Sequence, residues 1–258
     1  MSAGDDLGAC ALIVQKGDPD RFLATMAAKP AAREVLFPLH AFAIEVARAP
    51  WVTQEAMIGE MRLQWWRDAL EEIGSGGRVR RHEVVTPLAA WLDPEGAAVL
   101  DAAVEARRWD LYREPFEDEA AFAAHIDATT GGLFWVAARA LGAAQERVVR
   151  DFAYGVGVAN WLLAIPDLEG RGCFPLVDGR PEAVAELARE ALAQLLAARA
   201  QRGAVSRAAG QALLAGWQAE GVLRRALEAP GRVASGDLAA SEFARKAGLM
   251  RRALTGRW

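Results

Sequence analysis

Residues 159–176 read ANWLLAIPDLEGRGCFPL, an apolar helical run that meets a short polar cluster and then turns apolar again. Pro166 lies at the junction. A proline inside a helix removes a hydrogen bond and clashes with the preceding turn, so we expect the helix to end there. The cluster that follows holds two carboxylates, Asp167 and Glu169, and the guanidinium of Arg171. Two interpretations remain open: an interhelical loop in which Arg171 pairs with a carboxylate, or a polar site at the end of an apolar cavity.

Helical periodicity extends from this stretch along nearly the whole chain. Apolar residues recur at spacings of three and four, and the alternating patterns of strands are absent. The segments expected to form helices are 31–49, 52–73, 95–112, 117–141, 146–165, 181–202, 204–227 and 241–255. The pattern predicts an all-α fold of about eight helices, in one domain over residues 1–258 with residues 1–8 as a flexible tail.

Charge and composition exclude several classes of function. The chain has 258 residues and a net charge of −4, so no basic excess points to nucleic acid. Cys10 and Cys173 are too far apart in the sequence to suggest a disulfide framework or a zinc site. The longest stretch of low charge, Phe152–Pro166, is shorter than the roughly 20 residues of a membrane span. We expect a cytoplasmic protein without a nucleic-acid partner.

Common catalytic motifs are also missing. No phosphate-binding P-loop and no Gly-x-Ser-x-Gly nucleophile turn are present. The three histidines, His40, His82 and His125, show none of the spacings at which histidines hold a metal.

Five stretches, in order along the chain, carry a family resemblance. They are REVLFPLHAFAIEVARAPW (33–51), MRLQWWRDAL (61–70), TTGGLFWVAARALG (129–142), ANWLLAIPDLEGRGCFPL (159–176) and, more loosely, SEFARKAGLMRRAL (241–254). Together they resemble the squalene/phytoene synthase family across nearly the whole length. The resemblance implies an isoprenoid-synthase-type helical bundle around a central apolar cavity. In that family two aspartate-rich motifs face each other and hold a diphosphate through Mg²⁺, which prefers carboxylate and phosphate oxygens.

The first of those metal motifs is replaced in this chain. When Phe42 is placed on the family's phenylalanine, the three aspartate positions are taken by Ala47, Arg48 and Trp51. A wall that would attract a cation becomes neutral or positive, and Arg48 can pair directly with a phosphate.

The second metal motif is only partly kept. Asn160 and Arg171 match family positions, but Leu163 and Ala164 stand where an arginine and an aspartate belong. The resemblance therefore predicts a site for a lipid phosphate formed by Arg48, Asn160 and Arg171, with no metal ligands and no cofactor.

Several departures are similar to one subfamily, the mitochondrial assembly factor of respiratory complex I. Glu45 matches its glutamate, and Arg62 matches the arginine of its Met-Arg-Met-Gln motif. We expect Glu45, Trp51, Arg62 and Trp65 to lie at the cavity or within its motifs. This likeness implies a scaffold or assembly role, with respiratory-chain subunits as partners, a prenyl or lipid ligand, and peripheral contact with the inner membrane.

Two other functions stay open. An active, Mg²⁺-dependent enzyme that joins two prenyl diphosphates head-to-head would need Asp167 and Glu169 as catalytic carboxylates. Further acids for that enzyme would come from Glu45, Glu55 or Glu60. The other function is a peripheral lipid-binding module with no dedicated protein partner.

Overall fold

The computed structural model describes residues 3–53 and 55–258, which fold into helices packed around one continuous hydrophobic core. The helices of the first half are α1 (Ala3–Gly17), α2 (Pro19–Ala27), α3 (Pro30–Arg48), η1 (Ala49–Trp51), α4 (Ala56–Gly74), α5 (Val85–Ala89), α6 (Pro94–Ala106) and α7 (Arg108–Tyr112). Those of the second half are α8 (Glu119–Ile126), the π-helical turn η2 (Asp127–Gly131), α9 (Gly132–Leu141), α10 (Glu146–Gly170), α11 (Pro181–Ala200), η3 (Arg202–Ala204), α12 (Gly210–Leu213), η4 (Leu214–Gly216), α13 (Ala219–Glu228), α14 (Gly231–Ser235) and α15 (Glu242–Thr255). The described residues form no strand, which confirms the all-α prediction.

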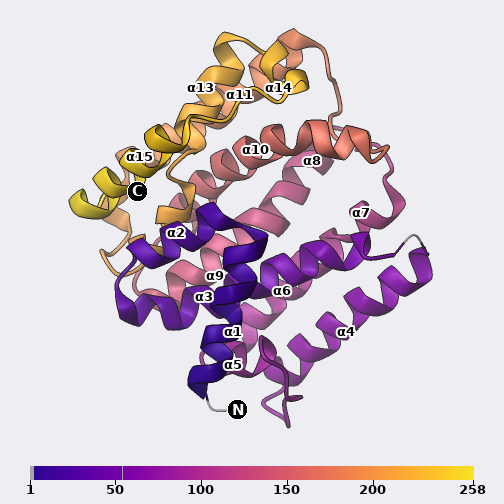
Figure 1. Ribbon diagram of the computed structural model, residues 1–258, viewed down its shortest axis with the longest axis vertical. Helices are drawn as coiled ribbons and strands as arrows, with labels where there is room; N and C mark the ends of the chain where they lie inside the picture. Colours follow the sequence, from indigo (N-terminus) through magenta and orange to yellow (C-terminus); the bar gives the residue numbers. More distant parts are fainter. Residues whose placement is uncertain (1–2, 54) are drawn as a thin grey trace.

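Helix α10 lies against α11 and α13 on one side and against the π-helical turn on the other (Figure 1). Two glycines allow this close packing. A Cβ on Gly155 would lie 2.6 Å from the Cβ of Leu195 in α11, and one on Gly157 would lie 2.5 Å from Ile126 Cγ2. Helix α10 is also the one described helix long and apolar enough to cross a membrane, but 67% of its apolar window is buried inside the protein. It is the core helix of the bundle.

The prediction that the helix stops at Pro166 was wrong. Helix α10 continues through Pro166 to Gly170, so Asp167 and Glu169 lie on its last turn and not in a loop. The last turn is held by the buried Leu168, whose carbonyl accepts the Cys173 N–H at 3.0 Å. Gly172, with φ at +80°, then redirects the chain. A proline removes only one hydrogen bond, and this turn makes enough other contacts to keep the helix intact.

The expected flexible tail was also wrong over the part that is described. Residues 3–8 belong to α1, and residues 1–2 lie outside the described chain. Asp6 is buried and accepts a charged hydrogen bond from Arg81, with Nη2 and Oδ2 2.8 Å apart. Cys10 and Val14 are fully buried in the core. Burial of these side chains in the core stabilises the N-terminal helix enough to offset the conformational entropy that the segment loses when it becomes ordered.

Other helix boundaries differ where short turns interrupt the period. The segment 204–227 is broken into two 3₁₀ turns and two α-helices, and 95–112 is split between α6 and α7. Helix α4 begins at Ala56 and not at residue 52, and the 3₁₀ turn η1 (Ala49–Trp51) follows directly on α3. The short helix α5, Val85–Ala89, lies between the expected helices 52–73 and 95–112 and was not among the predicted segments.

Candidate functional site

A cavity of about 380 Å³ opens between α3, α9, the π-helical turn and the end of α10. We call it the inner cavity. Its apolar wall is formed by Ala43, Ile44, Ala47, Leu133, Phe134 and Ala137. The wall comes from the cavity-facing stripes of two helices, since residues three and four apart share one face of a helix. Thr129 and Thr130 of the π-helical turn add hydroxyl groups. Such turns are frequent at functional sites.

Charge in the inner cavity is strongly one-sided. Four arginines line it, and Asp18 is the single carboxylate in its lining. The side chains of Arg21 and Arg107 are 21% and 23% exposed. The remaining two are more open, Arg48 at 65% and Arg171 at 44%. The cavity therefore has an inner pair of cations and an outer pair at its mouth.

Each arginine is oriented by a carboxylate. Arg21 Nε lies 3.3 Å from Asp18 Oδ2 inside the cavity. The other three partners do not line the cavity. They are Glu45 for Arg48 (Nη1–Oε1 3.2 Å), Asp110 for Arg107 (Nη1–Oδ2 3.3 Å) and Asp167 for Arg171 (Nη2–Oδ2 2.8 Å). The guanidinium groups are thus held in place while the space between them stays free of carboxylates other than Asp18.

Trp51 organises the mouth. Its ring contacts two guanidinium groups, Arg171 at 4.7 Å and Arg113 at 5.2 Å from the ring centroid. Arg113 also donates a hydrogen bond from Nη1 to the Arg171 carbonyl at 3.0 Å. Cation–π contacts of this kind contribute about 0.5–1 kcal/mol where they are exposed. Trp51 thus gathers two guanidinium groups at the mouth of the inner cavity.

His40 also faces the cavity but adds no charge near neutral pH. Burial lowers its pKa well below the usual value, and the nearby Arg21 lowers it further. Its Nδ1 lies 3.0 Å from Thr25 Oγ1. The positive character of the inner cavity therefore comes from the arginines alone.

Three residues grouped with the cavity by the resemblance lie in a neighbouring space. Glu45, Arg62 and Trp65 line a side pocket of about 350 Å³, with Arg48 shared between the two spaces. Arg62 is exposed and has no ion-pair partner among the described residues. The structure thus brings Arg48, Trp51 and Arg171 together in the inner cavity. Glu45, Arg62 and Trp65 line the side pocket, which shares Arg48 with the inner cavity.

Asn160 and the candidate catalytic carboxylates do not line the inner cavity. Asn160 is exposed on α10, and Glu169 is exposed on its last turn. Asp167 is 68% exposed and paired with Arg171. Glu60 accepts hydrogen bonds from Arg108 and Tyr112, and Glu55 is exposed just before α4.

The residues present do not fit the paired magnesium sites that the resemblance implies. Magnesium is held by one or two carboxylates together with phosphate oxygens and water. The inner cavity offers only Asp18, which is already bound by Arg21. Within residues 3–53 and 55–258, no group of three or more His, Cys, Asp or Glu side chains could hold a metal ion.

Sequence reasoning missed Arg21, Arg107 and His40 as cavity residues. They come from α2, the junction of α6 with α7, and α3. Arg21 and Arg107 lie outside the five family stretches, and ordinary surface arginines on amphipathic helices have the same local pattern. Of the three, only His40 could have been suspected from the sequence, because it lies in the first family stretch, directly before Ala41-Phe42.

Comparison with known proteins agrees with this architecture. A family model described as squalene/phytoene synthase matches residues 14–176. The chain is similar to a dehydrosqualene synthase crystallised with a ligand, with a TM-score of 0.80, 13% identity, and 98% of this chain and 96% of that chain covered. It is also similar to squalene synthase HpnC from Alicyclobacillus acidocaldarius, with a TM-score of 0.69, 16% identity, and coverage of 88% and 94%. No curated protein matches the chain. At these identities the likeness establishes the isoprenoid-synthase-type fold.

Proposed function

The chain belongs to the squalene/phytoene synthase family, and from that premise we propose that it binds a prenyl or lipid phosphate in the inner cavity without using magnesium to hold it. The observation that carries the proposal is the lining of the cavity, four arginines against one carboxylate. Guanidinium groups recognise phosphate oxygens through paired N–H donors. The apolar wall formed by α3 and α9 accommodates the hydrocarbon chain.

The two tiers of arginine suggest how the ligand lies. Arg48 and Arg171 at the mouth are the more exposed pair, and their carboxylate partners are Glu45 and Asp167. Surface ion pairs contribute little, so a phosphate can compete for these guanidinium groups at small cost. Arg21 and Arg107 are more deeply buried and add attraction from further inside. A cavity of about 380 Å³ is within the range of small-molecule sites.

Binding and turnover are separable by experiment. The purified chain is mixed with farnesyl diphosphate and Mg²⁺, and pyrophosphate release is followed beside calorimetric binding. We expect saturable binding with no release above the rate without protein. Release at an enzymatic rate would overturn the proposal and favour the head-to-head prenyltransferase. In that case Asp167→Ala should abolish turnover.

An assembly role is the second candidate. The observation that favours it is the side pocket, where Glu45 and Arg62, both matched to the assembly factor, lie together with Trp65 and Trp66. Affinity purification of the full chain from its native cell should then recover respiratory-chain subunits, and Arg62→Ala should reduce their recovery. Leu12→Ala, which changes an exposed residue of α1, serves as the control. Consistent absence of these subunits would rule the role out.

A further inference from the structure

Helix α15 carries its polar contacts on the side that faces the protein. Arg245 Nη1 lies 2.5 Å from Asp20 Oδ2, and Arg252 Nη2 lies 3.5 Å from Glu220 Oε2. Leu249 is the one buried apolar residue between them. Trp217 donates a hydrogen bond from Nε1 to the Arg245 carbonyl at 3.1 Å. These residues recur at spacings of three and four, so they form one face, and that face is mainly ionic.

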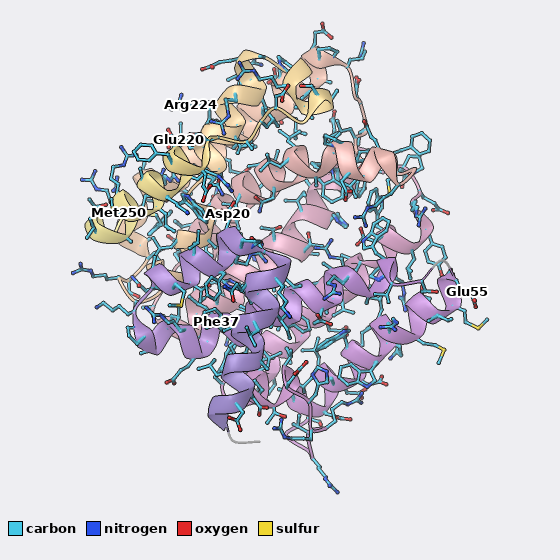
Figure 2. All side chains as sticks on the ribbon, in the orientation of Figure 1. Asp20, Phe37, Glu55, Glu220, Arg224 and Met250 are labelled. Carbon is cyan, nitrogen blue, oxygen red and sulfur yellow. The ribbon has the colours of Figure 1, made fainter. Side chains whose placement is uncertain are left out.

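The opposite face of α15 is apolar and exposed. Phe243 is 83% exposed, Met250 62% and Leu254 78%. They are spaced seven and four residues apart, which places them on one stripe of the helix. Figure 2 shows Met250 on the outer side of α15, with Asp20 on the side of the helical body. Surface helices of globular proteins normally turn the apolar stripe inward. In α15 the ionic face points inward and the apolar stripe points outward.

Cations border the stripe on both sides. Lys246 follows Phe243 by three residues, and Arg251 precedes Leu254 by three. Residues 242–258 hold five cations and one carboxylate, although the whole chain has a net charge of −4. Arg251 and Arg257 are exposed, and neither has an ion-pair partner within the described residues. Arg245 and Arg252 pair with Asp20 and Glu220 on the inner face, and Lys246 pairs with Glu242 at the surface. Positive charge therefore exceeds negative charge along the outward apolar stripe of α15.

We infer that α15 is a docking surface for an anionic lipid bilayer, with Phe243, Met250 and Leu254 inserted among the acyl chains and Lys246 and Arg251 at the phosphates. Helices that lie in a membrane interface combine an apolar face with flanking lysine and arginine, and anionic lipids attract such cations. A second copy of this chain is a poorer occupant, because a symmetric contact would set the same cations against each other. The inference stands independently of the ligand in the inner cavity.

The helix is fixed to the protein at both ends, so it docks as part of the folded body. Near its start, Arg245 pairs with Asp20 of α2, and the Arg245 carbonyl accepts the Trp217 Nε1–H. Trp258, just beyond its end, is buried against Phe152 with ring centroids 4.9 Å apart. An anchored helix lies flat in the interface and is already folded, so membrane binding does not require the entropy cost of folding a disordered segment.

Vesicle sedimentation with the full chain tests this surface. Vesicles of phosphatidylglycerol mixed with phosphatidylcholine are compared with vesicles of phosphatidylcholine alone, at low and high salt. We expect binding to the anionic vesicles that weakens with salt. The double variant Phe243→Glu with Leu254→Glu should lose at least about tenfold in affinity, because two apolar anchors become repelled charges. Leu12→Glu, at an exposed leucine of α1, should bind as the unmodified chain does.

A second double variant keeps the test valid if the first one does not fold. Lys246→Glu with Arg251→Glu leaves the apolar stripe intact and should abolish the preference for anionic vesicles. Circular dichroism and thermal unfolding confirm that each variant is folded. The inference fails if the unmodified chain does not bind anionic vesicles, or if neither double variant weakens binding. It also fails if the chain is a dimer that the stripe variant converts to monomers, because a second copy would then be the occupant.

Discussion

Two hollows of similar size in this molecule have opposite charge. The inner cavity, about 380 Å³, is lined by four arginines and one carboxylate. A surface groove of about 320 Å³ beside α11 is lined by four carboxylates, Glu119, Asp178, Glu186 and Glu190, and by one arginine, Arg180. We call it the acidic groove. The chain therefore has many carboxylates, but only Asp18 lines the inner cavity.

The comparison shows that the two hollows differ in where the charged side chains are placed, and that the overall composition of the chain does not reveal this difference. The two kinds of charge are nearly balanced, with 34 acidic and 30 basic residues. In the inner cavity, three carboxylates orient arginines from outside the lining. In the acidic groove, Asp178 and Glu186 are themselves paired with Arg180 and Arg189. The first hollow therefore suits an anion, and the carboxylates of the second are partly neutralised.

The largest expected effect comes from removing the outer cations of the cavity. Arg48→Gln with Arg171→Gln should weaken farnesyl diphosphate binding by about 100-fold, since each hydrogen bond to a charged group contributes ~1.5–3 kcal/mol. Isothermal calorimetry measures the change. Arg180→Gln in the acidic groove is the matched control and should leave the affinity unchanged. An equal loss in the control would show that the two hollows do not differ in the way we describe.

Titration tests whether histidine adds charge inside the protein. Burial lowers the pKa of His125 to about 3, with a further contribution from Arg107, and burial lowers that of His40 as well. The unfolded chain takes up protons below pH ~6.5 while these folded imidazoles do not, so stability is lost as pH falls. His125 alone should cost about 2 kcal/mol of unfolding free energy between pH 7 and 5.

Urea unfolding at several pH values measures this loss, and His125→Leu should remove that part of the slope. Ligand affinity, in contrast, should not rise from pH 8 to 6, because His40 remains neutral there and protonation of the ligand's terminal phosphate can only weaken its attraction to the arginines. Affinity that rises as pH falls through this range would mean that His40 becomes charged in the cavity.

A carboxylate introduced into the cavity should make it resemble the groove. Ala47→Asp places an acid at a half-buried position of the cavity lining. It should weaken binding of farnesyl diphosphate in EDTA about tenfold through repulsion at low dielectric. Ala183→Asp makes the same change at a half-buried alanine of the acidic groove. If both variants bind equally well, the charge of the cavity does not govern binding.

The smallest expected effect is a gain. Asp167→Asn releases Arg171 from an exposed ion pair, and such pairs contribute only about 0.2–1 kcal/mol. Affinity should rise about two- to threefold, whereas Asp178→Asn in the groove should have no effect. Competition binding with a fluorescent prenyl phosphate resolves changes of this size. A loss of affinity on Asp167→Asn would indicate that the carboxylate itself takes part in binding.

The sequence predicted the features that are set within one helix better than the features that depend on packing between helices. Periodicity located α3, α11 and α15 within one or two residues, because each has a regular apolar pattern and clear ends. It failed at Pro166, where contacts of Leu168 and Cys173 outweigh the proline. The resemblance placed Arg48, Asn160 and Arg171 at one phosphate site and Trp51 at the cavity, and of these Arg48, Trp51 and Arg171 line the inner cavity whereas Asn160 does not. It could not find Arg21 or Arg107, since only the packing of separate helices brings them to the cavity.

The metal dependence of binding tests the central claim most directly. Calorimetry with the unmodified chain and farnesyl diphosphate is performed once in EDTA and once with millimolar Mg²⁺. If arginines hold the phosphate, the dissociation constant should be the same in both, or larger with Mg²⁺ because the ion competes for the ligand. Binding that requires Mg²⁺ would contradict the account, since it would mean that carboxylates still hold a metal in this cavity.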